Sequence, residues 1–414
     1  MEGVYGIVGF ELVSRRLAWR RPKVSTDRPD AKEIGERLRK ARDNAKITQA
    51  DAAEAAGIAR TTLIAIEQGQ RRIRTEELQA LSRLYRVSAN AILRKEAVHV
   101  DLAPRFRKLA GAQSDSLDEA VGLLADLARA EVELENILGV TRVTNYPPER
   151  PILAGDVRLQ AEQDANELRQ RLGLGLAPVT NVVTLLEMEL GVRVFVRRFD
   201  GKISGLFAFD DAIGACILLN ANHPRERRNQ TGIHEVGHLV STRRVPEVLH
   251  LNDTDNSREE RYANAFARSF LTPARAVMQK FHEVTAGATQ LTRRHVIVLA
   301  HFFQVSREAM VLRLEELGLT KAGTWEWFQK NGDITDAHAR QVLGDLRQPD
   351  PLKAEADRPT TLRLALLAAE ALQRELLSEG QLARLLRMNR VELRELVDGL
   401  GIERGEPDGQ LQLK

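Results

Sequence analysis

The chain has 414 residues, of which 43% are hydrophobic and 29% are charged; these globular proportions argue against a wholly disordered chain and predict about two or three domains. The single cysteine, Cys216, excludes an internal disulfide framework and suits a reducing compartment. No apolar stretch approaches the roughly 20 residues of a membrane span, and Glu2 and Glu11 stand where a signal peptide would have a basic leader. We therefore expect a cytoplasmic protein with no membrane segment.

The charge is distributed unevenly along the chain. Residues 1–100 carry 20 Lys and Arg against 13 Asp and Glu, whereas the whole chain has a net charge of +3. A basic segment attracts the phosphate backbone of nucleic acid, although a solvated basic surface is the plain alternative. We therefore expect nucleic acid to bind the N-terminal part of the chain.

Periodicity and Pro-rich connectors divide the chain into five segments. The expected fold class is mainly α, and α+β overall. In chain order, the segments are a basic tail at 1–29, a domain of short amphipathic helices at 30–97, a helical linker at 98–150, a domain of helices and strands at 151–320, and a helical C-terminal region at 321–414.

A helix-turn-helix pattern follows the basic tail. Thr48, with Asp51 three residues later, is typical of a capped helix start. Gly57 can adopt the left-handed conformation that a tight turn needs. A second helix is expected from about Arg60, with Leu63 facing the core, and its other face offers donors for phosphates and for base edges in the major groove.

The segment "ITQADAAEAAGIARTTLIAIEQGQRRIRTEELQALSRLYRVSANAIL" resembles the Xre (lambda-repressor-like) helix-turn-helix family over residues 47–93. The resemblance implies a five-helix domain that binds a double-stranded DNA operator. Because most operators are two-fold symmetric, we also expect a homodimer. A helix-turn-helix reused for protein contact is the alternative. The DNA-binding residues that the resemblance implies are Gln49, Arg60, Thr61, Thr62 and Gln68.

Helical and strand patterns alternate in the middle of the chain. Apolar residues recur at helical spacing over Leu117–Leu138 and predict one longer helix. Three short apolar runs at 192–196, 203–209 and 212–219 predict a small antiparallel sheet. Helices are expected from about Arg227 to the end.

An HExxH motif, His234, Glu235 and His238, lies in the first of these later helices. The two histidines are one turn apart, so they share a face and can reach one ion. Glu235 is rotated by about 100° from His234 and can lie beside the ion without binding it. A catalytic zinc needs three protein ligands and one open position, so a third ligand is expected. Two satisfied histidines on a helix are the structural alternative.

The third ligand is expected on a helix that begins near Ser257. Ala263 and Phe266 belong to its buried stripe, and Glu260 lies one turn before Ala263, so its carboxylate projects along the same inward face. Glu259 could do so almost as well. The sequence therefore predicts a glutamate ligand from this helix.

The segments "RNQTGIHEVGHLV" and "EERYANAFARSFLTP" resemble the ImmA/IrrE family of metallopeptidases, whose members are similar to gluzincins. The resemblance implies a gluzincin-like domain in which His234, His238 and Glu260 bind zinc. It implies Glu235 as the general base. Manganese would also accept this ligand set.

One stretch departs from that family's pattern. The family commonly has Arg-Phe-Thr before the first histidine, and this chain has Asn229–Thr231. The change replaces an apolar packing residue and alters no ligand. The residue that stabilises an oxyanion stays unassigned, with Tyr262, His295 and His301 as the candidates.

The two resemblances imply a DNA-binding regulatory zinc endopeptidase that cleaves an Xre-type repressor and so switches on stress or mobile-element genes. The alternative is a transcriptional regulator or antitoxin that uses the metallopeptidase fold as a sensor or interaction module without turnover. The intact motif favours the enzyme, because a sensor has no need of Glu235.

Two later segments, 292–318 and 377–400, also have the pattern of helix-turn-helix cores. Packing or dimerisation is the expected role of both. A second DNA contact through Arg384, Arg387 or Arg390 is the alternative.

Overall fold

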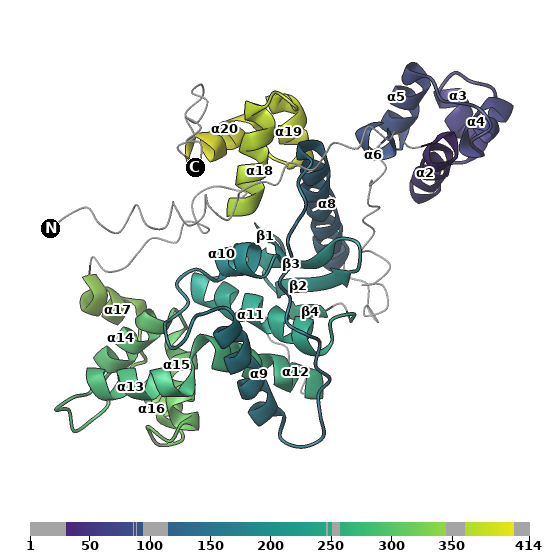
Figure 1. The fold of residues 1–414 in the computed structure, drawn as a ribbon. Coiled ribbons are helices and arrows are strands. Elements are labelled where there is room, and N and C mark those ends of the chain that lie inside the picture. Colours follow the sequence, from purple (N-terminus) through teal and green to yellow (C-terminus); the bar gives the residue numbers. More distant parts are fainter. Residues whose placement is uncertain are drawn as a thin grey trace, which may run out of the picture. The chain divides into compact units, whose positions relative to one another are not determined.

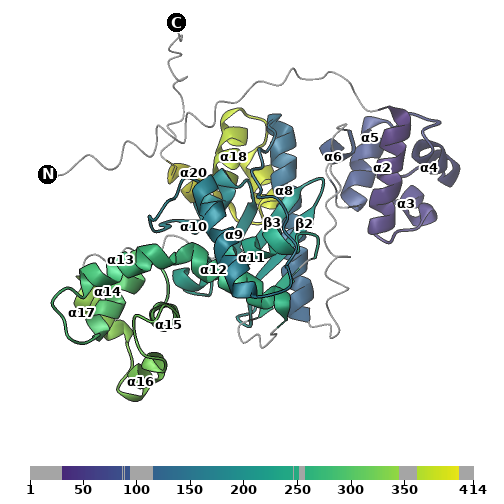
Figure 2. The ribbon, with the colours of Figure 1, turned by 60° about the horizontal axis from the view of Figure 1, so that its bottom comes forward.

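The computed structural model describes residues 30–85, 87, 89–93, 115–245, 247–250, 257–344 and 361–400. The basic tail expected at 1–29 and the Pro-rich connector at 348–359 lie outside these residues. The chain divides into two compact units, Met1–His99 with Glu131–Arg142, and Val100–Ala130 with Val143–Lys414. Figures 1 and 2 show the helices and strands of both units.

The first unit begins with the five short helices that the sequence predicts: α2 (Ala31–Asn44), α3 (Gln49–Ala55), α4 (Arg60–Glu67), α5 (Thr75–Leu84) and α6 (Ala89–Leu93). The side chain of Thr48 accepts a hydrogen bond from the N–H of Asp51 (3.2 Å) and so caps α3. Gly57, with a φ of +65°, makes the turn into α4. Leu38 and Leu63 are fully buried in the core of the five helices.

Helices also make up most of the second unit. The apolar spacing over Leu117–Leu138 predicts one continuous helix, and this helix is α8 (Asp115–Leu138). The division between the two units falls within α8. No helix among the described residues is both long and apolar enough to cross a membrane. The remaining helices are α9 (Val157–Arg171), α10 (Val182–Thr184), the π-helix η1 (Leu185–Glu189), α11 (Arg225–Ser241), α12 (Arg258–Leu271), α13 (Ala274–Val284), α14 (Arg293–Phe303), α15 (Arg307–Glu316), α16 (Thr324–Lys330), α17 (Asp336–Leu343), α18 (Leu362–Gln373), α19 (Glu379–Leu385) and α20 (Arg390–Asp398).

The second unit contains a four-stranded mixed sheet in the order β1-β3-β2-β4. Its strands are β1 (Arg193–Arg197), β2 (Ile203–Asp210), β3 (Gly214–Asn220) and β4 (Glu247–His250). The mainly α fold with a small sheet is confirmed, but the sheet is not wholly antiparallel as expected, because β1 runs parallel to β3. A tight turn joins β2 and β3 into a hairpin, whereas the longer connection after β1 lets β3 insert between β1 and β2.

The sequence does not predict β4. Its four residues are too few to give a readable alternating pattern. The strand forms because β2 offers it an edge, with which it pairs antiparallel. β4 lies in the connection between α11 and α12.

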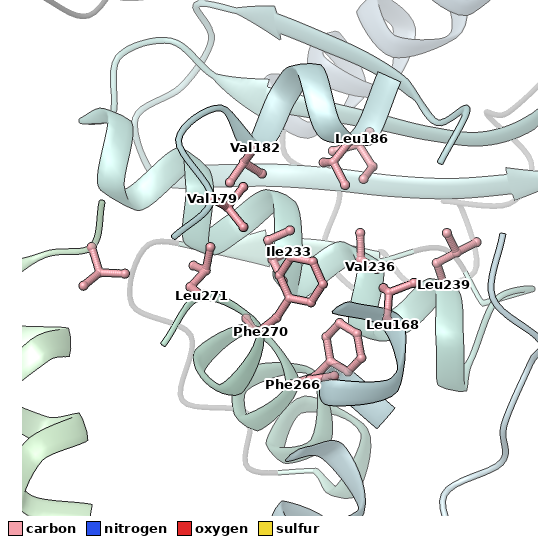
Figure 3. Close-up of a cluster of buried hydrophobic side chains, with 14 of the residues drawn as sticks. Leu168, Val179, Val182, Leu186, Ile233, Val236, Leu239, Phe266, Phe270 and Leu271 are labelled. Carbon is pink, nitrogen blue, oxygen red and sulfur yellow. The ribbon is translucent and has the colours of Figure 1, made fainter. Parts of the chain in front are cut away.

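The core of the second unit surrounds α11. This helix packs against α12 and against β2 and β3, and it is buried from Thr231 to Ser241. Figure 3 shows Ile233 and Val236 of α11 facing Phe266 and Phe270 of α12, and all four are at most 1% exposed. A helix buried on several sides holds its remaining polar side chains in a closed environment.

The two helices α11 and α12 approach each other most closely at Gly237. A Cβ at this position would lie 2.8 Å from the Cα of Ala263. Real side chains do not tolerate such a contact, so the crossing needs glycine on one helix and a small residue on the other. The crossing therefore sets the distance between the side chains on either side of it.

Replacing Gly237 with alanine is expected to destabilise the fold by about 1–3 kcal/mol, because α12 must move to admit the methyl group. Gly122 of α8 is the matched control, since it is also inside a helix but has open space around a Cβ. Gly122→Ala is expected to stabilise by about 0.5–1 kcal/mol through helix propensity alone. Urea unfolding of both variants measures the difference; equal stabilisation by both would show that the crossing is not tight.

Candidate metal centre

Three side chains from α11 and α12 converge on one point. The Nε2 atoms of His234 and His238 are 3.1 Å apart. The two carboxylate oxygens of Glu260 lie 3.3 Å from His234 Nε2 and 3.2 Å from His238 Nε2. Glu259, the other carboxylate considered for this role, is exposed and lies outside this cluster.

The spacing fits a tetrahedral zinc ion. Zinc–ligand distances of about 2.0–2.1 Å place neighbouring tetrahedral ligand atoms about 3.3–3.4 Å apart. The distance between the two Nε2 atoms, 3.1 Å, is close to that value. Glu260 approaches each histidine with a different carboxylate oxygen, Oε2 at 3.3 Å from His234 and Oε1 at 3.2 Å from His238. Three protein ligands leave the fourth corner of the tetrahedron open, as in catalytic rather than structural zinc sites.

The hydrogen bonds on the far side of each imidazole support the same interpretation. His234 Nδ1 lies 3.1 Å from Oδ1 of Asn264, and His238 Nδ1 lies 3.1 Å from Oγ1 of Thr242. An amide oxygen only accepts, so His234 donates from Nδ1, and in the neutral ring its Nε2 presents a lone pair to the cluster. Electron-rich atoms at this distance repel one another unless a cation lies between them.

Burial sets the protonation states that a metal requires. Burial lowers the pKa of His238, so this ring is neutral at neutral pH. Burial alone would raise the pKa of Glu260, but the adjacent imidazoles of His234 and His238 outweigh this effect and hold the pKa well below its usual range. Neutral imidazoles and an ionised carboxylate are the forms that bind divalent metals.

Glu235 lies next to the cluster and outside it. It follows His234 on α11 and is fully buried. A Cβ added to Gly205 of β2 would lie 3.6 Å from its Oε1, so the strand passes directly beside this carboxylate. The geometry separates one carboxylate that can bind a metal, Glu260, from one that can move a proton beside it.

Two of the three candidates for an oxyanion donor, Tyr262 and His295, have hydrogen-bond partners outside the ligand cluster. Tyr262 is fully buried and its hydroxyl donates to Asp164 of α9 (2.7 Å); burial and this hydrogen bond raise its pKa. His295 and His301 belong to α14, where His295 Nδ1 accepts from the N–H of Thr292 (3.3 Å). The hydrogen bond of Tyr262 therefore connects α12 to α9, and its hydroxyl does not face the ligand cluster.

Asn264 and Thr242 are the residues that sequence reasoning missed. Each stands four positions after a candidate ligand on the same helix or at its end, Asn264 after Glu260 and Thr242 after His238. That spacing is a usable signal, because side chains four apart share a helix face. Their oxygens fix the ring orientation of both histidines.

One candidate DNA-binding residue, Gln49, makes a hydrogen bond within the helix-turn-helix domain. Gln49 Nε2 donates to Oε2 of Glu67 (2.8 Å), and Arg42 Nε donates to the other oxygen of the same carboxylate (2.7 Å). The Gln49 amide therefore serves the packing of α3 on α4. The other four candidates lie on α4 or just after it, with Thr62 half-buried and the rest exposed: Arg60, Thr61, Thr62 and Gln68.

Removing either hydrogen-bond partner, Asn264 or Thr242, is expected to weaken zinc binding by about 10- to 100-fold, because the imidazole it orients loses its fixed position. Asn264→Ala and Thr242→Val are the variants, and competition with a chromophoric chelator measures the zinc affinity. Thr242→Ser keeps the hydroxyl and is expected to bind like the wild type.

Thr285→Val is the structural control, because Thr285 has the same capping place at the end of α13. If Asn264→Ala and Thr242→Val bind zinc as the wild type and the Thr285→Val control do, Asn264 and Thr242 do not orient the ligands.

Comparison with known proteins agrees with this geometry. Residues 187–315 match the IrrE N-terminal-like domain of the Peptidase_M78 family, and residues 38–92 match the helix-turn-helix family HTH_3. No curated protein sequence matches the chain at a significant level. The crystal structure of ComR from Streptococcus suis aligns over 90% of this chain and 95% of that chain at 9% identity, with a TM-score of 0.16, a value too low to indicate a shared fold.

The matched domains contain the candidate sites described above. The expected resemblances are thus confirmed at the level of the domains, and they support a DNA-binding regulator with an IrrE-like protease domain. The chain joins an Xre-like helix-turn-helix domain to an ImmA/IrrE-like Peptidase_M78 domain.

Proposed function

We propose that the chain is a zinc-dependent endopeptidase that acts in gene regulation, binding an operator through its helix-turn-helix and cleaving a repressor-type protein. The observation that carries the peptidase is the ligand triangle of His234, His238 and Glu260 at 3.1–3.3 Å, with Glu235 beside it. Zinc is the expected metal, and manganese suits the same ligands.

Bound at this cluster, zinc would act as a Lewis acid on the peptide carbonyl and on water. Glu235 would take the proton from the attacking water and deliver it to the leaving amine. Asn264 and Thr242 would hold the two imidazoles in place during the reaction.

The proposed substrate is an Xre-type repressor, whose cleavage would switch on stress or mobile-element genes. This choice rests on the fusion of an Xre-like domain to the peptidase domain. The fused domain would bind the operator itself or bring the peptidase to a repressor bound there. An extended substrate would bind the sheet by adding a strand to its edge.

The proposed DNA-contacting face is the exposed side of α4, with Arg60, Thr61 and Gln68 toward the major groove and Thr62 at its margin. Gln49 would contribute to DNA binding indirectly, through its hydrogen bond to Glu67. A homodimer would match a two-fold operator, and sedimentation with and without DNA tests it; a monomer in both conditions excludes it.

The second candidate function is a regulator or antitoxin that senses through the peptidase fold without turnover. One observation favours it: His234, Glu235 and His238 are each at most 1% exposed, so a substrate has no open path to them in this conformation. The two functions differ in whether Glu235 matters.

Glu235→Gln is expected to keep one zinc and full DNA affinity but to lose cleavage by at least about a hundredfold, because the general base is gone. Metal analysis, operator binding and cleavage of a co-expressed repressor measure the three properties. His238→Ala and Glu260→Ala are expected to lose zinc as well. Identical repressor cleavage or gene expression in wild type and Glu235→Gln would favour the sensor.

Arg60→Ala is expected to weaken operator binding by about 1–3 kcal/mol, because a charged donor leaves the groove. The operator is the duplex that the wild-type chain selects from a random library. Arg83→Ala removes the same charge from an exposed position on α5 and is the matched control. Equal losses for both variants would point to general charge attraction instead of recognition by α4.

A further inference from the structure

The edge of the sheet nearest to Glu235 is already occupied. β2 passes so close to α11 that a Cβ on Gly205 would lie 2.6 Å from Cγ2 of Thr231 and 3.6 Å from Oε1 of Glu235. β2 is therefore the strand beside the candidate catalytic carboxylate. A peptide that added itself to this edge would run next to Glu235 and the ligand cluster.

β4 holds this position. It pairs antiparallel with β2 through Ile203–Phe207, and Leu249 lies directly opposite Gly205. Residues directly opposite in an antiparallel pair point to the same face of a sheet. Because the Cβ direction of Gly205 is toward α11, the side chain of Leu249 also lies on the α11 face, where a substrate side chain would lie.

The pairing is irregular at the same place. The register shifts between Ile203 and Gly205, so β2 has one extra residue, Ser204, against β4. Bulges of this kind end or redirect strand pairing and are frequent beside active sites. The ladder between β2 and β4 is thus interrupted beside Gly205, the residue closest to Glu235.

The ligand cluster has little solvent exposure in the structure, in which β4 is paired with β2. The side chains of His234 and His238 are 1% and 0% exposed, and that of Glu260 is 12% exposed. A peptide bond cannot reach the open corner of the ligand triangle without displacing part of the protein.

β4 is the part of the sheet that can leave at least cost. It is four residues long, and Val248 and Leu249 are only half-buried. The opposite edge of the sheet is better secured, since Oγ1 of Thr361 donates to the carbonyl of Val194 on β1 (3.1 Å). Segments with few buried contacts open first in native proteins.

We propose that β4 takes the place of an extended substrate on β2, so that the peptidase site stays closed until this strand leaves the sheet. The proposal rests on the proposed peptidase function, but the closure of the site by β4 can be measured without metal or turnover. Because β4 belongs to the connection between α11 and α12 and to neither helix, its release from β2 would leave the crossing of the two helices in place.

The test is the rate at which diethyl pyrocarbonate modifies each histidine of the metal-free full-length chain, read by mass spectrometry. In the wild type, His234 and His238 are expected to react at least about tenfold more slowly than the exposed His282, because reagent reaches them only when the structure opens locally. Leu249→Gly is expected to raise the rates of both. Replacement of residues 247–250 by Gly-Ser-Gly-Ser is expected to bring them near that of His282.

Val245→Gly is the control, since it changes an exposed apolar residue of the same connection outside the strand and is expected to leave the rates unchanged. Hydrogen exchange at β2 and the unfolding midpoint report on the rest of the fold. If His234 and His238 stay protected in a folded chain that lacks the β4 residues, the strand does not close the site and the proposal is overturned. If they become reactive but the wild type binds no zinc, the closure stands and only the proposed peptidase function fails.

Discussion

The close crossing of α11 and α12 is the constraint on which the rest of the candidate metal centre depends. Gly237 has no side chain, so the backbone of Ala263 can lie against it. His238 follows this crossing on one helix, and Glu260 precedes it by one turn on the other. Metal coordination tolerates errors of only about 0.2 Å, so the ligand triangle exists only because the two helices are in direct contact. Phe266 and Phe270 on the same helix continue the contact into the core.

The electrostatics of the centre follow from its burial. The neutral imidazole of His238 and the carboxylate of Glu260, whose pKa is strongly lowered, form a pocket of negative potential that a cation balances. The hydrogen-bond partners behind the imidazoles, Asn264 and Thr242, are neutral groups. They orient the rings without adding further negative charge, so the ligand set as a whole carries one negative charge. Such a site retains the Lewis acidity of a bound divalent ion better than a site with several carboxylates.

The short strand β4 connects this chemistry to the sheet. It lies in the connection that joins the two ligand-bearing helices, and it pairs with the strand beside Glu235. In the mechanism that we propose, access to the metal centre therefore depends on whether β4 stays paired with β2. In the helix-turn-helix, by contrast, the candidate binding surface is open. The buried ion pair of Arg42 with Glu67 connects α2 to α4 and leaves the outer face of α4 exposed.

Features that lie within one element could be predicted from the sequence. The i, i+4 spacing placed His234 and His238 on one face of a helix, and Gly57 marked the turn before α4, because both depend only on backbone geometry between neighbours. Helical periodicity favoured Glu260 only narrowly over Glu259, and the family resemblance implied Glu260; the tertiary structure places Glu260 beside the two histidines, because only this side chain meets α11. Tertiary structure alone decided the insertion of β3 between β1 and β2, the formation of β4, and the bond of Tyr262 to α9. Each of these depends on contacts between segments far apart in the chain, and local periodicity carries no information about which distant surface an element will meet.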